Sequence, residues 1–323
     1  MIITSCPLRV SLVGGSTDHP KFIEKYGFGS VISFASTLRT YVTIHEDIFG
    51  TNTIDNNYVI NYSKRESVKH ISDIQNELIR YCFEYLDVKQ INCSLTSDIF
   101  SVGSGLAASS SYLLSLIKSI HILDDKKITE FEICKMAEKI EKLFNPLVGQ
   151  QDFYGSIGGL KKIKFYKDED PEIRFLNTKI FNTLDMYLMY TGVLRSSTSV
   201  LESVDIDMSV PLLTDVIDLE NAINDCNINQ FNDIINRSWE NKKKTSQYIC
   251  ENEILVEMDE KLKTDNEVLS HKLCGAGNGG FFLIFTEKNK QLEMEKKYNN
   301  IKQITISETG IKSINLKNEF TTL

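Results

Sequence analysis

The sequence predicts an α+β fold, and two observations lead to that prediction. Short runs rich in β-branched and aromatic residues, typical of strands, are spread over both halves of the chain. Segments with apolar residues at helical spacing lie between them and dominate the second half. Because strands and helices do not alternate strictly, a doubly wound parallel sheet is not favoured. The 323 residues are enough for two domains or one large one.

The first half of the chain contains most of the expected strands. Runs with strand character lie at Arg9–Val13, Val31–Ser36, Tyr41–His45, Tyr58–Tyr62 and Ile91–Thr96. Apolar residues recur at helical spacing from Ile71 to Leu86, and a second helix is expected from about Leu106 to Leu123. Thr129 and Glu132 have the spacing of a capping box, which predicts that a further helix begins there.

The second half reads as a strand followed by long helices and a short mixed end. The strand is expected at Leu184–Thr191, and helical patterns extend from about Pro211 to Ser270. The closing elements are expected at Phe281–Thr286 (strand), about Lys288–Asn299 (helix), Ile304–Ser307 (strand) and Ile311–Leu316 (strand). We place the domain boundary so that residues 1–178 form one domain and residues 179–323 the other.

Composition excludes several classes of partner. A net charge of −8 makes nucleic acid an unexpected partner, because such proteins usually present a basic surface. The short basic run Lys242–Lys244 is interpreted as a solvated helix face. No run of about 18 apolar residues is present, so no membrane partner is expected. The first residues lack the features of a secretory signal peptide, and we therefore expect a cytoplasmic protein.

The seven cysteines do not form a recognisable framework. Their number is odd and no two of them have the spacing of a CxxC pair. Scattered reduced thiols explain this pattern better than disulfides or a zinc site.

The first of three informative glycine-containing segments is Pro7–Asp18. It reads as a strand running into a tight turn that ends in the carboxylate of Asp18. Paired glycines would let this carboxylate approach a ligand hydroxyl closely, because they remove the steric barrier of a side chain. A plain turn with an Asx hydrogen bond would explain the same residues.

The second segment, Ser101–Ser111, lies between an expected strand and an expected apolar helix. Its glycines would let backbone N–H groups point inward, and the helix N-terminus behind them would add a positive dipole. Such a loop suits phosphate, and its serines offer hydroxyls for phosphate or Mg²⁺. The alternative is a flexible loop with a serine N-cap, but the strand–loop–helix context favours the anion site.

The third segment, Cys274–Phe285, contains a literal match to G-x-G-x-x-G at Gly275, Gly277 and Gly280. A dinucleotide-binding fingerprint requires a helix after the turn, whereas here an apolar strand follows, so that interpretation is rejected. The sequence also lacks a P-loop motif and the HRD and DFG motifs of protein kinases.

Carboxylates close to these segments complete the set of candidates. Glu138 and Glu141 lie on the helix that begins near Thr129, and Asp152 follows in the run Gly149–Tyr154. One carboxylate near a phosphate loop can hold Mg²⁺, and another can serve as a base for an attacking hydroxyl. For Glu141, a solvated helix position is the alternative.

The order of these segments resembles the GHMP kinase superfamily, which includes galactokinases and homoserine, mevalonate and phosphomevalonate kinases. The resemblance covers essentially the whole chain. The phosphate loop of that family is typically P-x-G-S-G-L-G-S-S, and here it reads VGSGLAASS. Ala107 and Ala108 are departures from a glycine and a serine, whereas Ser109 is retained.

Within the superfamily, the sequence is most similar to bacterial D-glycero-D-manno-heptose 7-phosphate kinases and related sugar 1-kinases. The segments PLRVSLVGGSTD, IEKLFNPLVGQQDFYGSIGG, YTGVLRSSTSVL and HKLCGAGNGGFFLIF carry this likeness. The helix with Trp239 and Lys242 also has a counterpart there. Ser16, His271 and Asn278 stand where that group usually has glycine.

The resemblance implies a two-domain GHMP kinase fold, with an N-terminal ATP-binding domain like ribosomal protein S5 and a ferredoxin-like C-terminal domain. It implies ATP and Mg²⁺ as cofactors and a sugar or sugar phosphate as substrate. Asp152 would be the catalytic carboxylate facing the sugar hydroxyl, with Arg9 beside it to stabilise developing charge. Ser109 and Glu141 would coordinate Mg²⁺.

The same resemblance assigns the remaining site residues. The nucleotide phosphates would be wrapped by Gly103, Ser104, Gly105, Leu106, Ala107, Ala108, Ser109 and Ser110. The sugar would be contacted by Gly15, Thr17, Asp18, Tyr154, Arg195 and Gly277. For Arg195, whose guanidinium suits a substrate phosphate, a structural ion pair is the alternative.

Three functions remain open from the sequence. The first is an ATP-dependent kinase for the anomeric hydroxyl of a heptose 7-phosphate. The second is a non-catalytic sugar sensor of the same fold. The alanines Ala107 and Ala108, which depart from the phosphate loop of the family, are the features that support it. The third is a related kinase for another sugar, an isoprenoid precursor or an amino acid, although Asp18 favours a polyol. The oligomeric state is open, with a homodimer as one option.

Asp152→Asn tests the assignment of the base. A general base typically contributes about 10²–10⁴-fold to the rate, so the variant should lose turnover by that factor. ATP binding should persist, because phosphate contacts do not depend on this carboxylate. Steady-state kinetics and nucleotide titration measure the two effects, and full turnover in the variant would refute the role.

Overall fold

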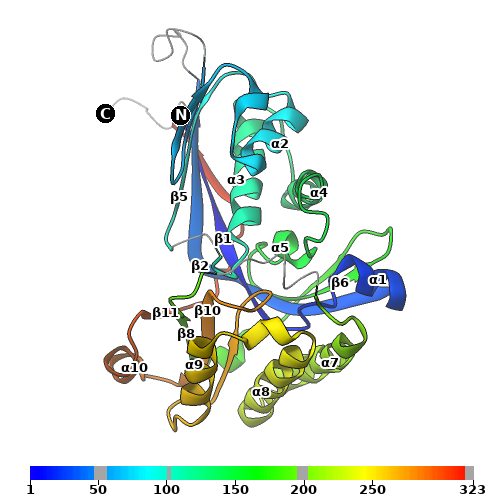
Figure 1. The fold of residues 1–323 in the computed structure, drawn as a ribbon, viewed down its shortest axis with the longest axis vertical. Helices are drawn as coiled ribbons and strands as arrows, with labels where there is room; N and C mark the ends of the chain where they lie inside the picture. Colours follow the sequence, from blue (N-terminus) through cyan, green and yellow to red (C-terminus); the bar gives the residue numbers. More distant parts are fainter. Residues whose placement is uncertain (47–56, 100–102, 195–202, 317–323) are drawn as a thin grey trace.

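The computed structural model describes residues 1–46, 57–99, 103–194 and 203–316, and contains two β-sheets with helices packed on them. Figure 1 shows the larger sheet standing upright with α2, α3 and α4 along one face, and the smaller sheet below it with α7 to α10. The predicted α+β class is therefore confirmed. Within the described residues, no helix is both long and apolar enough to cross a membrane.

The larger sheet is almost entirely antiparallel. Its order is β12-β1-β2-β5-β3-β4, with β6 paired to β2 and β7 to β6, and β3 with β5 is the parallel pair. The strands are β1 (Ile2–Val13), β2 (Phe28–His45), β3 (Tyr58–Asn61), β4 (Arg65–Val68), β5 (Asn92–Ser97), β6 (Leu160–Tyr166), β7 (Glu172–Phe175) and β12 (Lys312–Asn315). The long pair β1 and β2 forms its spine, and β12 near the end of the chain pairs with β1.

Helices cover one face of this sheet. They are α1 (Pro20–Tyr26), α2 (Glu77–Leu86), α3 (Ala108–Leu123), α4 (Glu130–Glu141) and α5 (Gln151–Tyr154). The apolar helix α3 packs on β1 and β2, and its residues Leu113 and Ile117 are fully buried in the core. The predicted capping box is confirmed, because Thr129 and Glu132 exchange hydrogen bonds at the start of α4.

The smaller sheet has the order β11-β8-β10-β9. Its strands are β8 (Leu184–Tyr190), β9 (Ser270–Leu273), β10 (Phe281–Glu287) and β11 (Ile301–Ile304). The accompanying helices are α7 (Pro211–Asn224), α8 (Ile228–Lys244), α9 (Glu253–Lys263) and α10 (Gln291–Lys297), and short 3₁₀ turns lie at Ile71–Asp73, Lys179–Asn182, Asp207–Ser209 and Gln247–Cys250.

Several predicted boundaries were wrong for identifiable reasons. Val31–Ser36 and Tyr41–His45 belong to the single strand β2, because Arg39 and Thr40 between them also pair with β1. The helical pattern predicted up to Ser270 ends at Lys263, since Ser270 opens β9. The strand predicted at Ile304–Ser307 is displaced toward the N-terminus in the structure, where it forms β11. The proposed domain boundary after residue 178 stays a prediction.

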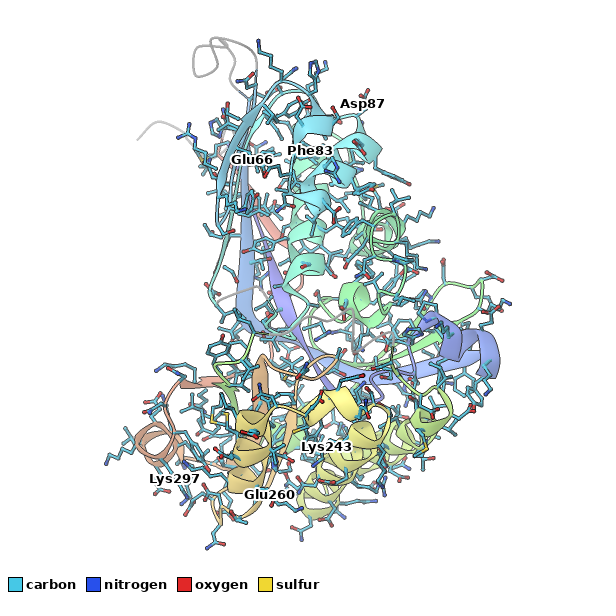
Figure 2. The ribbon with its side chains drawn as sticks, viewed as in Figure 1. Glu66, Phe83, Asp87, Lys243, Glu260 and Lys297 are labelled. Carbon is cyan, nitrogen blue, oxygen red and sulfur yellow. The ribbon has the colours of Figure 1, made fainter. Side chains whose placement is uncertain are left out.

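The start of α2 illustrates how tertiary contacts override a periodic pattern. The prediction began this helix at Ile71, but it begins at Glu77, capped by Asn76. The carboxylate of Glu66 on β4 accepts hydrogen bonds from the backbone N–H groups of Gln75 (2.7 Å) and Asn76 (3.2 Å), which hold this segment extended. Figure 2 shows Glu66 on the sheet beside α2, the helix that carries the buried Phe83.

The two sheets meet along the second half of β1. Leu8, Val10 and Leu12 pack into the same hydrophobic core as the buried strand residues of β8 and β10. The buried side chain of Lys272 on β9 donates hydrogen bonds to the carbonyl oxygens of Ser11 (3.0 Å) and Leu12 (2.8 Å). Burial lowers the pKa of this lysine to about 8. Strand β1 therefore belongs structurally to both parts of the molecule.

The turn after β1 leaves no room for a side chain at Gly14. A Cβ atom there would lie 2.2 Å from the carbonyl oxygen of Ser30 and 2.6 Å from Val216 on α7, and φ is +87°. Gly14 thus lets the end of β1 approach both β2 and α7.

Gly14→Ala should lower the free energy of unfolding by two additive effects. The left-handed backbone costs about 1–2 kcal/mol for a non-glycine residue. Overpacking against Ser30 and Val216 adds about 1–3 kcal/mol. Gly27→Ala is the matched control, because φ is +83° there but no atom lies within 4 Å of the added Cβ. Urea unfolding measures both variants, and equal losses would contradict the steric explanation.

Candidate active site

A cavity of about 370 Å³ lies where the two sheets meet. Its walls come from the turn after β1, the loop before α3, the end of α4, α5, the end of α8 and the turn after β9. These segments are far apart in the sequence, and they include all three glycine-containing segments singled out above.

Arg9 and Asp152 form the centre of this cavity. Arg9 lies on β1 with its side chain only 4% exposed, whereas the side chain of Asp152 on α5 is 24% exposed. The Asp152 Oδ1 atom accepts hydrogen bonds from Arg9 Nε (3.0 Å) and Nη2 (2.5 Å). Arg9 Nη1 donates to the carbonyl oxygen of Gly105 at 2.6 Å. One guanidinium therefore positions the carboxylate relative to the loop before α3.

The loop before α3 has the geometry of an anion site. It ends in Ala107, whose φ of 58° turns the chain into the N-terminus of α3 at Ala108. Helix N-termini present unpaired N–H groups and positive dipole ends, which suit phosphate. The turn after β9 supports the loop from behind, because a Cβ at Gly280 would lie 2.5 Å from the Ser104 carbonyl oxygen.

Glu141 at the end of α4 is the buried carboxylate facing this loop. Its Oε2 atom accepts a hydrogen bond from Ser110 Oγ at 2.9 Å. Burial, reinforced by the charge of Asp152, raises the pKa of Glu141 to about 7. Ser109, the serine predicted to hold Mg²⁺ with Glu141, lies next to Ser110 with its side chain exposed and lines the cavity.

A carboxylate and hydroxyls at a phosphate loop fit Mg²⁺, which usually takes one or two protein carboxylates plus phosphate oxygens. Over the part of the chain that the structure describes, no group of three or more His, Cys, Asp or Glu side chains is suited to hold a metal alone. Glu141 with the neighbouring serines is thus the group that would hold this ion beside bound phosphates.

Asp18 is a second buried carboxylate that lines the cavity. It accepts hydrogen bonds from the backbone N–H (3.2 Å) and the Nε2 atom (3.0 Å) of Gln151. Burial and then the charge of Asp152 raise its pKa. The cavity therefore holds two buried carboxylates besides Asp152, Glu141 near the loop and Asp18 in the turn after β1.

Most residues predicted for the site line the cavity. They are Arg9, Gly15, Asp18, Gly103, Ser104, Gly105, Ala107, Ala108, Ser109, Ser110, Glu141 and Asp152. Four predicted residues do not line it: Leu106 and Tyr154 are buried core residues, Thr17 bonds the carbonyl oxygens of Gly14 and Ser30, and Gly277 packs against Ile249. Arg195 lies outside the described residues.

Other cavity residues were missed or misread from the sequence. His19, Gln151, Lys242 and Lys272 line the cavity but were not predicted as site residues. Gln151 and Lys272 lie within the segments that carry the resemblance, whereas His19 follows the first segment directly. The interpretation of Lys242–Lys244 as a solvated face holds for Lys244 alone. Lys242 reaches the cavity, and Lys243 forms an ion pair with Asp259 at 2.7 Å. Because successive residues of a helix point in different directions, the three lysines have different surroundings. The basic run in the sequence does not show this difference.

Three of the residues that stand where the resemblance predicts glycine share one backbone property. Ser16, Ala107 and Asn278 all have positive φ values, of 84°, 58° and 60°. Glycine adopts this region without strain, whereas other residues do so at a cost that is smallest for Asn. The backbone at these three positions therefore has the conformation that glycine adopts most easily.

Comparisons with known proteins agree with this geometry. The sequence matches no family model. It is 26% identical over 337 residues to the D-glycero-α-D-manno-heptose 7-phosphate kinase of Campylobacter jejuni, covering 97% of this chain and 98% of that protein.

Solved structures extend the comparison to the fold. A D-glycero-D-manno-heptose 1-phosphate kinase from Bacteroides thetaiotaomicron superposes with a TM-score of 0.77 at 21% identity, covering 98% of this chain and 99% of that one. The galactokinase of Lactococcus lactis in complex with galactose gives 0.71 at 15% identity, covering 97% and 95%.

The fold is thus that of the GHMP kinases, as predicted. The resemblance to heptose 7-phosphate kinases is confirmed over nearly the whole chain. The relatives are named kinases, and the predicted class of enzyme, a kinase, is thereby confirmed.

Glu141→Gln should change how stability depends on pH. The pKa of Glu141 is raised from 4.5 to about 7 in the folded protein, so the unfolded chain releases this proton first. Stability should therefore fall as pH rises from 4.5 to 7, by about 3 kcal/mol, and then level off. Gln does not titrate and removes this contribution.

Urea unfolding of both proteins at pH 5 and pH 8, without Mg²⁺ or nucleotide, measures the effect. The difference in unfolding free energy between the variant and the natural protein should shift by about 3 kcal/mol in favour of the variant at pH 8. A difference that is the same at both pH values would contradict the raised pKa.

Proposed function

We propose that this protein is an ATP-dependent sugar kinase that phosphorylates the anomeric hydroxyl of D-glycero-D-manno-heptose 7-phosphate. The observation that carries the proposal is the Arg9–Asp152 ion pair, tied to the phosphate-binding loop through Gly105. The similarity to a heptose 7-phosphate kinase over 97% of the chain supports the choice of acceptor.

The proposed reaction uses Asp152 as the base. The acceptor hydroxyl oxygen attacks the γ-phosphorus of ATP, the bond to the bridging β,γ oxygen breaks, and ADP leaves with that electron pair. The hydroxyl proton passes to Asp152, whose Oδ1 is occupied by Arg9 and whose Oδ2 would face the acceptor. Arg9 would stabilise the charge that develops on the phosphoryl group.

The remaining groups would position the substrates. The loop Gly103–Ser110 and the N-terminus of α3 would hold the nucleotide phosphates, and Asp18 would accept hydrogen bonds from sugar hydroxyls. Mg²⁺ at Glu141 and Ser109 would neutralise phosphate charge. Phosphoryl transfer depends mainly on such positioning and charge neutralisation, which this cavity offers. A cytoplasmic location fits this activity and stays part of the proposal.

Two alternatives are less well supported. A non-catalytic sugar sensor would not require the Arg9–Asp152 pair. In this pair the buried guanidinium of Arg9 holds the partly exposed carboxylate of Asp152 in place. A kinase for an isoprenoid precursor or an amino acid would have less use for Asp18, since carboxylates bind polyol hydroxyls well.

The test is ADP release by purified protein with Mg²⁺ and ATP, against heptose 7-phosphate, galactose, fucose, N-acetylhexosamines and mevalonate. We expect turnover with heptose 7-phosphate, abolished by EDTA and lost in Asp152→Asn. Turnover with mevalonate, or none with any sugar despite nucleotide binding, would contradict the proposed acceptor or the proposed activity, respectively.

A further inference from the structure

The end of the cavity beyond Asp18 contains a buried donor that has no partner among the described residues. His19 follows Asp18 and caps α1, and its Nδ1 accepts a hydrogen bond from the backbone N–H of Lys21 at 3.2 Å. The neutral imidazole must therefore carry its proton on Nε2. His19 is only 3% exposed and lines the cavity, and its Nε2 has no hydrogen-bond partner among the described residues. An unpaired buried donor costs about 1–3 kcal/mol, which a ligand acceptor would recover.

A cation lies beside this donor. Lys242, on the last turn of α8, lines the cavity, and its Nζ contacts Ser16 Oγ in the turn after β1. Burial, followed by the charges of Lys21 and Lys242, lowers the pKa of His19 and keeps its ring neutral. The three side chains thus offer one ammonium, one imidazole N–H and one hydroxyl.

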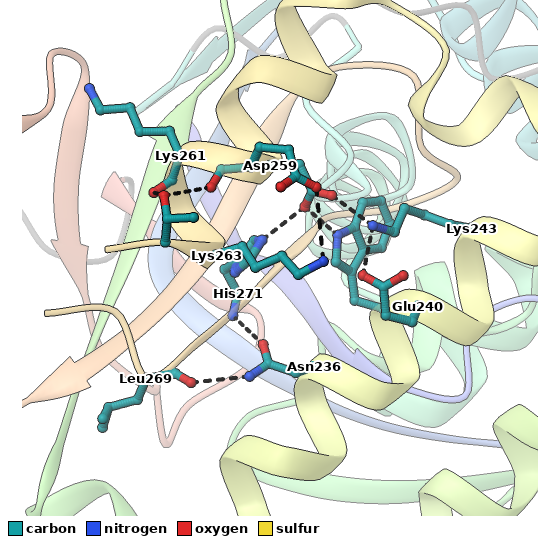
Figure 3. A network of polar contacts seen from close by, with 11 residues as sticks. Asn236, Glu240, Lys243, Asp259, Lys261, Lys263, Leu269 and His271 are labelled. Carbon is teal, nitrogen blue, oxygen red and sulfur yellow. Dashed lines mark hydrogen bonds and ion pairs between the residues drawn. The ribbon is translucent and has the colours of Figure 1, made fainter. Parts of the chain in front are cut away.

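A polar network fixes the helix that carries Lys242. The buried carboxylate of Asp259 on α9 accepts hydrogen bonds from Trp239 Nε1 (2.6 Å), His271 Nε2 (2.8 Å) and Lys243 Nζ (2.7 Å). Figure 3 shows these contacts between α8, α9 and β9. With Lys243 held there, the preceding residue points about 100° around the helix, toward the cavity. Lys242 therefore has a restricted side chain. Binding a ligand would cost it less conformational entropy than it would cost a freely moving surface lysine.

This end of the cavity is separate from the phosphate-binding loop. Arg9 links Asp152 to the loop through the Gly105 carbonyl oxygen. Asp18 is hydrogen-bonded to Gln151, the neighbour of Asp152, and Lys242 contacts Ser16, two residues before Asp18. The order along the cavity is therefore loop, Asp152, Asp18, and then the group of Ser16, His19 and Lys242. Since the reacting hydroxyl belongs at Asp152, that group would meet the far end of the acceptor.

We propose that Lys242, His19 and Ser16 form a subsite for an anionic group that the acceptor already carries, so that the acceptor is a sugar phosphate rather than a free sugar. The assignment rests on the proposed function, because it takes the far end of the cavity as the acceptor site. A phosphate ester accepts hydrogen bonds from all three side chains, and an ammonium serves as its point charge.

The experiment compares D-glycero-D-manno-heptose 7-phosphate with the same heptose lacking the phosphate. We would measure kcat and KM for both acceptors and for ATP in the natural protein, Lys242→Met, His19→Asn and Lys244→Met. Met keeps the length of the side chain without its charge, and Asn keeps a capping acceptor for α1 without the Nε2 donor. Lys244, exposed at the end of the same helix, is the matched control.

We expect Lys242→Met to raise the KM for heptose 7-phosphate about 10- to 100-fold, and His19→Asn about 3- to 10-fold. The KM for ATP, the kinetics with the free heptose and all constants of Lys244→Met should not change. If both acceptors weaken equally, Lys242 merely offsets the charge of Asp18, and the proposal is overturned. An increase confined to the KM for ATP would overturn it as well.

Binding of heptose 7-phosphate without nucleotide, measured by calorimetry, separates this inference from the proposed function. If no sugar is turned over but heptose 7-phosphate still binds in a manner that Lys242→Met abolishes, the kinase proposal fails and the subsite stands. If the free heptose is turned over as well as its phosphate, the kinase proposal stands and the subsite fails.

Discussion

The buried guanidinium of Arg9 joins three segments that are far apart in the sequence. It lies on β1, pairs with Asp152 on α5 and donates to the Gly105 carbonyl in the loop before α3. A buried cation is tolerated only when it is paired and hydrogen-bonded, so each of these partners is required by the fold as well as by the site. The position of the carboxylate relative to the loop before α3 is consequently set by a single rigid group with fixed donor directions.

The cavity depends equally on close approach between backbones. The loop before α3 and the turn after β9 touch through glycines, since a Cβ at Gly105 would lie 2.7 Å from the Cys274 carbonyl oxygen. Lys272, two residues before Cys274, ties the smaller sheet to β1. Both sheets therefore contribute to the floor of the cavity, and neither one would form it alone.

Several residues around the cavity stand where the resemblance to GHMP kinases predicts glycine. Ser16 and Ala107 adopt left-handed backbone conformations that glycine would adopt without strain. His271, at another position where the related kinases usually have glycine, joins the network around Asp259 that holds α8. None of these residues belongs to the Arg9–Asp152 pair, since Ser16 and Ala107 line the cavity and His271 lies in the network that holds α8.

The sequence by itself determined the α+β class, the principal strands and helices, and the centre of the site, because these depend on local patterns. Periodicity identified α3 and β10, the Thr129 capping box was visible as a pair of residues, and the glycine-rich segments with Asp18 and Asp152 kept recognisable motifs. The strands β4, β6, β7 and β9 were not identified, since each contains charged or polar residues among its apolar ones.

Only the tertiary structure decided which side chains meet. Lys242 and Ser16 are 226 positions apart and touch because α8 packs beside the turn after β1. Only the three-dimensional structure shows that His19 Nε2 has no hydrogen-bond partner among the described residues. Likewise, Lys242, Lys243 and Lys244 follow one another in the sequence but lie in three different environments around one helical turn. Contacts of this kind depend on how elements far apart in the sequence pack together. Local sequence patterns do not specify which distant side chains come into contact.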